Sequence, residues 1–446
     1  MSVSLDHDHT NEGDTTMSQQ GPAATGGPVV PIPPALQEVL DRVPSDVPSP
    51  ECIYRRGLLL SFEDLSSFGL TRLGAAGISG LVGYESLGLR TIGLLTNGPL
   101  HLYTLPSGVD PFVAAVGLQT LGHQAAPVLR AGYAGHWGYA PGRPPEDNVA
   151  VAPDVQFSDV GAADDGPLIG VIDTGFTYLG DNSLAGRISA ATPNDVERPN
   201  EFEPDLAGHG SFVASVILQQ RPTANVIIAA VRNAPLDQFV GAEDSDLVGL
   251  SAAHANHILD HFPRSWYVPS PNGMPDEIQM LDAVERLIDL NPGEPYAALN
   301  VSMGTYPANI LATSALAVIA AVDEWNGESG SPIAAAAGNH PPTKVGPTTG
   351  FIPAELPGVI GVVAGNADGE VAPYTNRLTK RFTPRQDEEV LAVGSDIVGM
   401  RQPGVLTRWS GSSFATAVVS ASIANEMDRP TIYELRDENM VSPKAR

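Results

Sequence analysis

The sequence has only one cysteine, Cys52, among its 446 residues. A single thiol cannot form an intramolecular disulfide, so the fold must be held together by its core. The chain also lacks any run approaching the roughly 18 consecutive apolar residues that cross a bilayer. Hydrophobic residues still make up 42% of the chain, enough for a sizeable core. These features exclude a disulfide-stapled scaffold and a membrane-spanning helix, and they predict a soluble protein.

Basic residues are scarce. The chain has 24 Lys and Arg against 51 Asp and Glu, which gives a formal net charge of −27. A field of this sign repels phosphate backbones and anionic lipid surfaces, so we expect neither a nucleic acid nor a membrane as a partner. The acidity also suits structural calcium sites, but a solvated acidic surface accounts for it equally well.

The first residues lack the basic patch and apolar run of an export signal. The chain begins MSVSLDHDHTNEGDTTMSQQ, which is polar and acidic. This predicts a cytoplasmic protein, with two alternatives: export by another route, or a misassigned start.

Composition divides the chain into three parts. Residues 1–50 are rich in Asp, Gly, Pro, Ser and Thr and predict a disordered tail. Residues 51–147 predict a small α+β domain, with a helix near Pro111 and a strand at APVLR, followed by a Pro/Gly-rich linker. A hairpin turn is predicted at Asn97 and Gly98. Residues 148–446 form the third and largest part.

The largest part alternates short apolar strands with helical patterns. Its strands are PLIGVID, NVIIAAV, AALNVSM, PIAAAAG and GVIGVVA, and its helices include GSFVASVILQQ and DEIQMLDAVERLI. Nearly continuous hydrophobic strands between helices indicate an α/β fold, a mostly parallel sheet covered on both faces. Functional groups are then expected in the loops at the carboxyl ends of the strands.

Four polar residues stand out at such positions. Asp173 ends PLIGVID, His209 lies between two glycines at a helix start, Asn339 follows PIAAAAG, and Ser413 opens the helix GSSFATAVVSASIA. Each has a plainer reading: a capping acid, a packing histidine, a turn residue and a helix cap. Together they supply an orienting acid, a general base, an oxyanion donor and a nucleophile.

The order Asp, His, Asn, Ser with these local sequences resembles the subtilisin-like serine proteases from about Gly166 to Asn425. The resemblance implies a three-layer fold around the sheet. It makes Asp173 the orienting acid, His209 the base, Asn339 an oxyanion donor and Ser413 the nucleophile. It also implies a set of substrate-binding residues, namely Ser302, Met303 and Gly304 in a strand that pairs with extended peptides, Ala337 and Gly338 before the asparagine, and Phe351. Phe351 is expected near the floor of the pocket for the residue before the cut, where its bulk would favour small side chains.

The α+β domain resembles the inhibitory propeptide of the same family, with an accessory domain as the alternative. The expected function is therefore a serine endopeptidase made as a precursor, whose partners are polypeptide substrates and its own N-terminal domain. The alternative is a silent fold that binds peptides without cutting them. The chemistry needs no cofactor and no metal.

Several positions depart from the family pattern. Ala417 stands where the family has proline, Phe212 where a second histidine is frequent, and Ser215 where glycine is frequent. The end, DRPTIYELRDENMVSPKAR, is predicted to be irregular. An insertion between Val240 and Pro275 carries His254, His257, Asp260 and His261, which we interpret as a helix surface, with a metal site as the alternative.

Overall fold

The computed structural model describes most of the chain. Unit Ile32–Arg446 is one compact body and Met1–Pro31 is another. The described residues are 31–43, 54–73, 99–133, 146–147, 166–177, 184, 186–197, 206–232, 239–240, 275–291, 295–305, 315–339, 350–378, 389–402, 405–424, 433–436 and 439–440. The predicted turn at Asn97 and Gly98 lies outside them.

A central sheet dominates the C-terminal part. Its order is β19-β18-β15-β14-β13-β11-β7-β9-β8, and the seven strands from β15 to β8 run parallel. In chain order these seven are β7 (Leu168–Asp173), β8 (Ile188–Ala190), β9 (Asn225–Ala230), β11 (Ala298–Val301), β13 (Ile333–Ala336), β14 (Val359–Gly365) and β15 (Glu389–Val393). The five strands predicted from apolar runs are all present, and the predicted mostly parallel α/β fold is confirmed.

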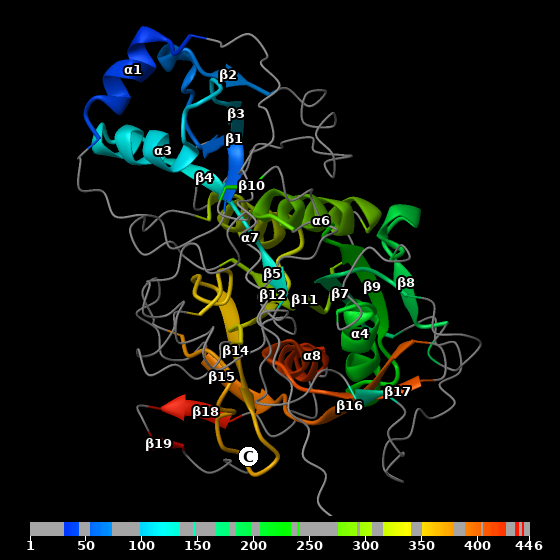
Figure 1. The fold of residues 1–446 in the computed structure, drawn as a ribbon. Helices are drawn as coiled ribbons and strands as arrows, with labels where there is room; N and C mark the ends of the chain where they lie inside the picture. The colour runs from blue at the N-terminus through cyan, green and yellow to red at the C-terminus, as the bar shows by residue number, and fades with distance from the viewer. Residues whose placement is uncertain are drawn as a thin grey trace, which may run out of the picture. The chain divides into compact units, whose positions relative to one another are not determined.

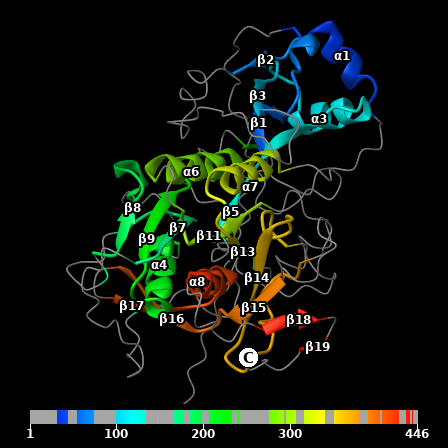
Figure 2. The ribbon, with the colours of Figure 1, turned by 180° about the vertical axis from the view of Figure 1, so that it is seen from behind.

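Helices cover both faces of this sheet, as Figures 1 and 2 show. One face carries α6 (Glu277–Leu290) and α7 (Leu316–Glu328), and the other carries α4 (His209–Gln220) and α8 (Ser412–Ile423). Strand β7 alternates between them: Ile172 packs in the α6/α7 core, while Ile169 and Val171 pack in the α4/α8 core. Because successive side chains point to opposite faces, Asp173 faces the α4/α8 side.

A smaller sheet lies in the N-terminal region. Its order is β10-β1-β3-β2 with β4 on the other edge of β1, and all pairs are antiparallel. The elements are α1 (Pro34–Leu40), β1 (Tyr54–Ser61), η1 (Ser66–Phe68), β2 (Thr71–Arg72), β3 (His101–Thr104), α3 (Pro111–Thr120), β4 (Ala125–Leu129) and β10 (Phe239–Val240). The helix and strand predicted near Pro111 and at APVLR are both present. The last strand, β10, comes from more than 100 residues later in the chain.

Two predicted irregular segments contain regular structure. The expected tail includes helix α1, because Leu36 and Val39 are buried in the core beside α3. The expected irregular C-terminus includes β18 (Tyr433–Arg436), antiparallel to β15, and β19 (Asn439–Met440). In both places tertiary contacts override a polar, Pro-rich local composition.

Short strands and a turn complete the description. They are β5 (Gly132–Tyr133), β6 (Glu146–Asp147), β12 (Met303–Gly304), β16 (Ile397–Gln402), β17 (Val405–Trp409) and η2 (Pro193–Asp195). Strand β5 pairs with β12, and β6 pairs with the β16–β17 hairpin.

Buried polar contacts join the N-terminal sheet to the helix α6. Arg55 Nη1 of β1 lies 3.2 Å from Asp276 Oδ2, and both side chains are almost fully buried. The Glu277 carboxylate accepts hydrogen bonds from Leu129 N (2.7 Å) and from Ala317 N at the start of α7 (3.0 Å). Removing one partner of such a buried set leaves a charge or donor unsatisfied, which is strongly destabilising. The two regions are therefore expected to unfold together.

Glu277 gives this junction a pH dependence. Burial raises the pKa of Glu277 from its ordinary 4.5 to about 8, while its backbone hydrogen bonds act in the opposite direction. Between pH 4.5 and about 8 the folded chain keeps a proton that the unfolded chain has released. Its contribution is therefore complete below pH 4.5, falls as the pH rises through this window, and is lost above about 8.

We expect the free energy of unfolding to fall between pH 5 and 8, with a slope from this group that approaches about 1.4 kcal/mol per pH unit. Urea denaturation at a series of pH values measures it. Glu277→Gln should flatten the dependence, whereas Glu328→Gln, at an exposed position of α7, should leave it unchanged. An equal slope in all three proteins would contradict the assignment.

Candidate active site

Asp173 is held at the carboxyl end of β7. Its Oδ1 accepts a hydrogen bond from Thr174 N at 2.7 Å, and the side chain is fully buried. Thr174 in turn accepts from Gly210 N through its Oγ1 at 3.0 Å, so the end of β7 is tied to the start of α4. These two bonds fix the carboxylate toward that helix.

His209 is the first residue of α4, and its Nδ1 lies 2.6 Å from Asp173 Oδ1. The ring packs between Trp409, edge-on at 5.1 Å, and Phe414 at 5.4 Å between centroids. A neutral imidazole that donates Nδ1–H to a carboxylate carries its lone pair on Nε2, which is the form that accepts a proton. The sequence placed this imidazole at the rim of the helix, but it is fully buried.

The two glycines beside His209 allow close backbone approach. A methyl group on Gly210 would lie 2.6 Å from Gly175 O and 3.1 Å from Asp173 Cβ. Gly208 has a φ of +75°, and a methyl group there would lie 2.4 Å from Arg401 O. Both positions therefore exclude a larger residue, and this packing brings the imidazole to the carboxylate.

Ser413 lies in the first turn of α8 and is fully buried. Its Oγ donates to Ser302 O at 3.2 Å, and its own carbonyl accepts from Ser302 Oγ at 3.2 Å. Further along, Ser302 Oγ contacts Asn300 Oδ1, and Asn300 Nδ2 donates to Ser420 Oγ at 3.1 Å. This chain of bonds anchors α8 to β11. The sequence did not single out Asn300 or Ser420, because their roles depend on a contact between two residues that are 120 positions apart in the chain.

Asn339 lies beside the start of α8. Its Oδ1 accepts from Ser412 N at 2.9 Å, so its Nδ2 group is directed to the other side of the amide. Gly338 N donates to Ser412 Oγ at 3.1 Å, which holds the loop from a second point. Ser412 thus positions the amide next to Ser413, a role that the sequence did not reveal.

The predicted substrate strand is already paired. Met303 is opposite Tyr133 and Gly304 is opposite Gly132 in an antiparallel ladder. Ser302, Met303 and Ala337 are fully buried, and Phe351, also buried, donates its N–H to Ala337 O at 2.9 Å. All of the predicted substrate-binding residues therefore lie around the carboxyl ends of β11 and β13.

The departures from the family pattern have structural roles. Phe212 packs against Trp409 and Phe414, with centroids 5.5 and 4.6 Å away. Ser215 Oγ accepts from Met400 N at 2.9 Å and so joins α4 to β16. Phe212 thus packs against the two rings that contact His209, and Ser215 ties α4 to the neighbouring strand.

The part of the chain that the structure describes contains no group of three or more His, Cys, Asp or Glu placed to hold a metal ion. None of its helices is both long enough and apolar enough to cross a membrane. His254, His257, Asp260 and His261 lie outside the described residues.

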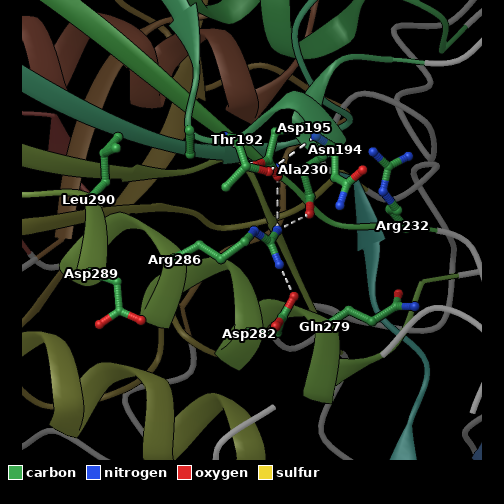
Figure 3. A pocket seen from close by; sticks show the side chains of 11 residues that line it. Thr192, Asn194, Asp195, Ala230, Arg232, Gln279, Asp282, Arg286, Asp289 and Leu290 are labelled. Carbon is green, nitrogen blue, oxygen red and sulfur yellow. Dashed lines mark hydrogen bonds and ion pairs between the residues drawn. The ribbon is translucent and has the colours of Figure 1, made fainter. Parts of the chain in front are cut away.

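A separate cavity of about 390 Å³ lies between α6, η2 and the end of β9 (Figure 3). Arg286 crosses it and donates to Asp195 Oδ1 at 3.0 Å and to Ala230 O at 2.6 Å, and it pairs with Asp282. Asp195 also accepts from Ala230 N at 2.7 Å. The Arg286 guanidinium is therefore paired with the carboxylates of Asp195 and Asp282. None of Asp173, His209 and Ser413 lines the cavity. We interpret it as a structural clamp apart from the candidate active site.

The arrangement as a whole has the parts needed for acyl transfer. The buried Asp173 carboxylate orients the His209 imidazole. Ser413 lies at the start of α8, one residue before Phe414, whose ring contacts that imidazole. The Asn339 amide lies beside the start of the same helix. An extended chain segment lies along the adjoining strand. Such a site can bring a carbonyl group to the hydroxyl and an oxyanion to the amide and helix N-terminus.

Comparison with known proteins agrees with this chemistry. The model of the subtilase family (Peptidase S8) matches residues 164–437. Solved structures that match include the prenylagaramide maturation protease PagA (19% identity, 57% of this chain and 73% of that chain, TM-score 0.39). Others are the patellamide maturation protease PatA (19%, 58% and 76%, 0.37) and a cold adapted subtilisin-like serine proteinase (18%, 58% and 73%, 0.38). No curated protein sequence matches. The family model carries the assignment, since the structural scores are low.

Proposed function

Because the chain belongs to the subtilase family of serine proteases, we propose that it is an endopeptidase in which Ser413 is the nucleophile, His209 the general base and Asp173 the orienting acid. The observation that carries the proposal is the buried 2.6 Å hydrogen bond between His209 Nδ1 and Asp173 Oδ1. It selects the imidazole tautomer that accepts a proton at Nε2, and it stabilises the imidazolium formed when the proton arrives.

The proposed reaction proceeds in two halves. In the first, Ser413 Oγ leaves the Ser302 carbonyl, passes its proton to His209 and bonds to the carbonyl carbon of the substrate. The C–N bond breaks as His209 gives that proton to the leaving amine. In the second half, water takes the place of the amine and hydrolyses the acyl-enzyme, which releases a carboxylate and restores the Ser413 hydroxyl.

Asn339 is proposed to stabilise the oxyanion of both tetrahedral intermediates. Its Oδ1 is occupied by Ser412 N, which leaves Nδ2 as the donor side of the amide. We expect Asn339→Ala to lower kcat about 100- to 1,000-fold with little change in KM, the range known for one oxyanion donor in a subtilisin. Steady-state kinetics on a peptide substrate test this, with Asn326→Ala on the exposed side of α7 as the control. A matching rise in KM alone would assign Asn339 to substrate binding instead.

The N-terminal region, residues 51–147 as predicted, is proposed to act as an inhibitory domain. The support is that its strand β5 occupies the edge of β12 on which a substrate would pair. The buried contacts of Arg55 and Leu129 with α6 hold that strand in place. Substrate can enter only after this segment leaves, so the full-length chain is expected to be a restrained precursor.

The alternative is a silent peptide-binding fold, which the contact of Ser413 Oγ with Ser302 O favours. A fluorophosphonate probe distinguishes the two, because it reacts only with an activated serine. We expect the purified chain, once the segment that contains β5 has left β12, to be labelled, with mass spectrometry assigning the adduct to Ser413, and to degrade casein. A chain that is neither labelled nor proteolytic would favour the binding fold.

A further inference from the structure

A short segment, residues 195–197, runs beside the turn that follows Asp173. The segment and the turn form a parallel β-bridge. Phe176 N donates to Asp195 O at 2.8 Å, and Glu197 N donates to Phe176 O at 2.9 Å. The backbone of this segment therefore fixes the path of the chain as it leaves the proposed orienting acid.

The side chain of Asp195 anchors one end of the segment. Its Oδ1 accepts from Ala230 N at 2.7 Å and from Arg286 Nη2 at 3.0 Å. Its Oδ2 accepts from Thr192 N at 2.8 Å. The Asp195 side chain is almost fully buried, and Figure 3 shows Arg286 reaching it. Since three groups hold this carboxylate, the first residue of the segment has a fixed place.

Glu197 lies at the other end of the segment, and its carboxylate contacts the start of α4. Its Oε1 and Oε2 accept from Gly208 N at 3.0 and 2.9 Å. Its Oε2 also accepts from Thr174 Oγ1 at 3.3 Å. Gly208 is the residue before His209, and Thr174 is the residue after Asp173. The carboxylate thus bonds to a neighbour of each member of the proposed acid–base pair.

Two threonines extend this network into the first turn of α4. Thr174 Oγ1 donates to Glu197 and accepts from Gly210 N at 3.0 Å. Because a hydroxyl has one proton, its donation to the carboxylate leaves its lone pairs for Gly210 N. Thr177 Oγ1 also donates to Glu197 Oε2 at 3.3 Å, and Thr177 N donates to Ser211 Oγ at 2.7 Å. The turn and the helix start are therefore joined at several points that share one acceptor.

A short contact depends on this network. His209 Nδ1 and Asp173 Oδ1 are 2.6 Å apart, and both side chains are fully buried. A misplacement of about 1 Å at a catalytic group can cost roughly 100-fold in rate. A carboxylate suits the task of holding both neighbours, since it accepts several hydrogen bonds at once and its charge strengthens each of them. Without Glu197, the Gly208 N–H and the two threonine hydroxyls would lose their shared acceptor.

We propose that Glu197 is a positioning residue of this protease, whose carboxylate holds the residue after Asp173 and the residue before His209 at a fixed separation and so keeps the imidazole aligned with the acid. The inference rests on the proposed function. Glu197 transfers no proton itself and acts through Thr174 and Gly208. Its loss should therefore slow the chemical step and leave substrate binding unchanged.

Steady-state kinetics of Glu197 variants test the proposal. Glu197→Ala should lower kcat about 100-fold, with KM within about twofold of the wild type. The peptide substrate is added once the segment that contains β5 has left β12, and kcat is expressed per Ser413 that fluorophosphonate labels at completion. Glu197→Gln keeps an oxygen at the place of Oε2, which all three donors approach. It should recover at least about tenfold of the loss.

A double-mutant cycle with Thr174→Val tests the route of the effect. This change removes the hydroxyl that joins Glu197 to Gly210 N, and it should lower kcat by itself. If the two residues act through one network, the loss in the double variant should be smaller than the product of the single losses by at least about threefold. Losses that multiply in full would contradict the proposed route.

Glu370→Ala is the matched control, because Glu370 is an exposed glutamate in the turn after β14 and its kinetics should equal those of the wild type. If Glu197→Ala does not fold, Glu197→Asp takes its place. It withdraws the carboxylate by one methylene and should lower kcat more than Glu197→Gln does. The reverse order would overturn the proposal.

Thermal unfolding and labelling separate the remaining outcomes. A Glu197→Ala protein that unfolds at a lower temperature but keeps the wild-type kcat per labelled serine would overturn the proposal and leave Glu197 as a helix cap. A rise in KM alone would also overturn it and make Glu197 a substrate contact. A wild-type chain that fluorophosphonate does not label would reject the proposed function, and this inference with it.

Discussion

Ser413→Ala is expected to reduce proteolysis by about a million-fold, the loss known for the nucleophile of subtilisin, and to leave the chain at full length. Without Oγ no acyl-enzyme can form, and His209 and Asp173 have no proton to transfer. The variant should also lose fluorophosphonate labelling. Casein hydrolysis and the size of the chain on a denaturing gel measure both effects.

The matched control for this change is Ser422→Ala in the same helix. Ser422 lies nine residues further along α8, and its Oγ donates to Val418 O at 2.6 Å. Its loss should leave labelling and proteolysis nearly unchanged. If Ser413→Ala retained proteolysis above one-hundredth of the wild-type rate, another residue would have to be the nucleophile.

Asp173→Asn is expected to lower kcat about 10,000-fold, as for the equivalent change in another serine protease. The amide has nearly the same shape as the carboxylate, so folding should persist. However, its NH₂ group favours the imidazole tautomer with the proton on Nε2, which cannot accept the serine proton. Thr174 N would then lose its acceptor, because it donates to the same Oδ1 atom that contacts His209 Nδ1.

Asp289→Asn provides the control for this carboxylate. Asp289 is exposed on α6 and lines the cavity around Arg286. We expect full activity, because that cavity contains none of the proposed catalytic residues. Unequal thermal unfolding of the Asp173→Asn protein and the wild type would indicate lost stability, so activity should be compared at a temperature where both are folded.

The sequence predicted the layers of the large sheet well, because its five central strands are almost entirely buried and so read as apolar runs. It also placed Asp173, His209, Asn339 and Ser413 at strand ends and helix starts, where the structure has them. The flanking glycines of His209 were informative, since both are required by close backbone contacts. Their catalytic roles remain proposals.

Other features could not be read from local sequence. Helix α1 and strand β18 lie in polar or Pro-rich segments and owe their order to distant partners, α3 and β15. The hydrogen-bond path from Ser413 through Ser302 and Asn300 to Ser420 joins residues more than 100 positions apart. The pairing of β5 with β12 is equally non-local. Periodicity carries no information about such contacts.

The N-terminal sheet takes one of its strands from far downstream. Strand β10, at Phe239–Val240, pairs with β1 at Tyr54 and Arg55. During synthesis, the first 133 residues leave the ribosome long before Phe239 has been translated. Until then, Tyr54 and Arg55 of β1 lack the strand β10 with which they pair. The N-terminal sheet can therefore be completed only after residue 240 has been synthesised. Its folding is thus coupled to that of the C-terminal part, and it cannot serve as a finished template that folds first.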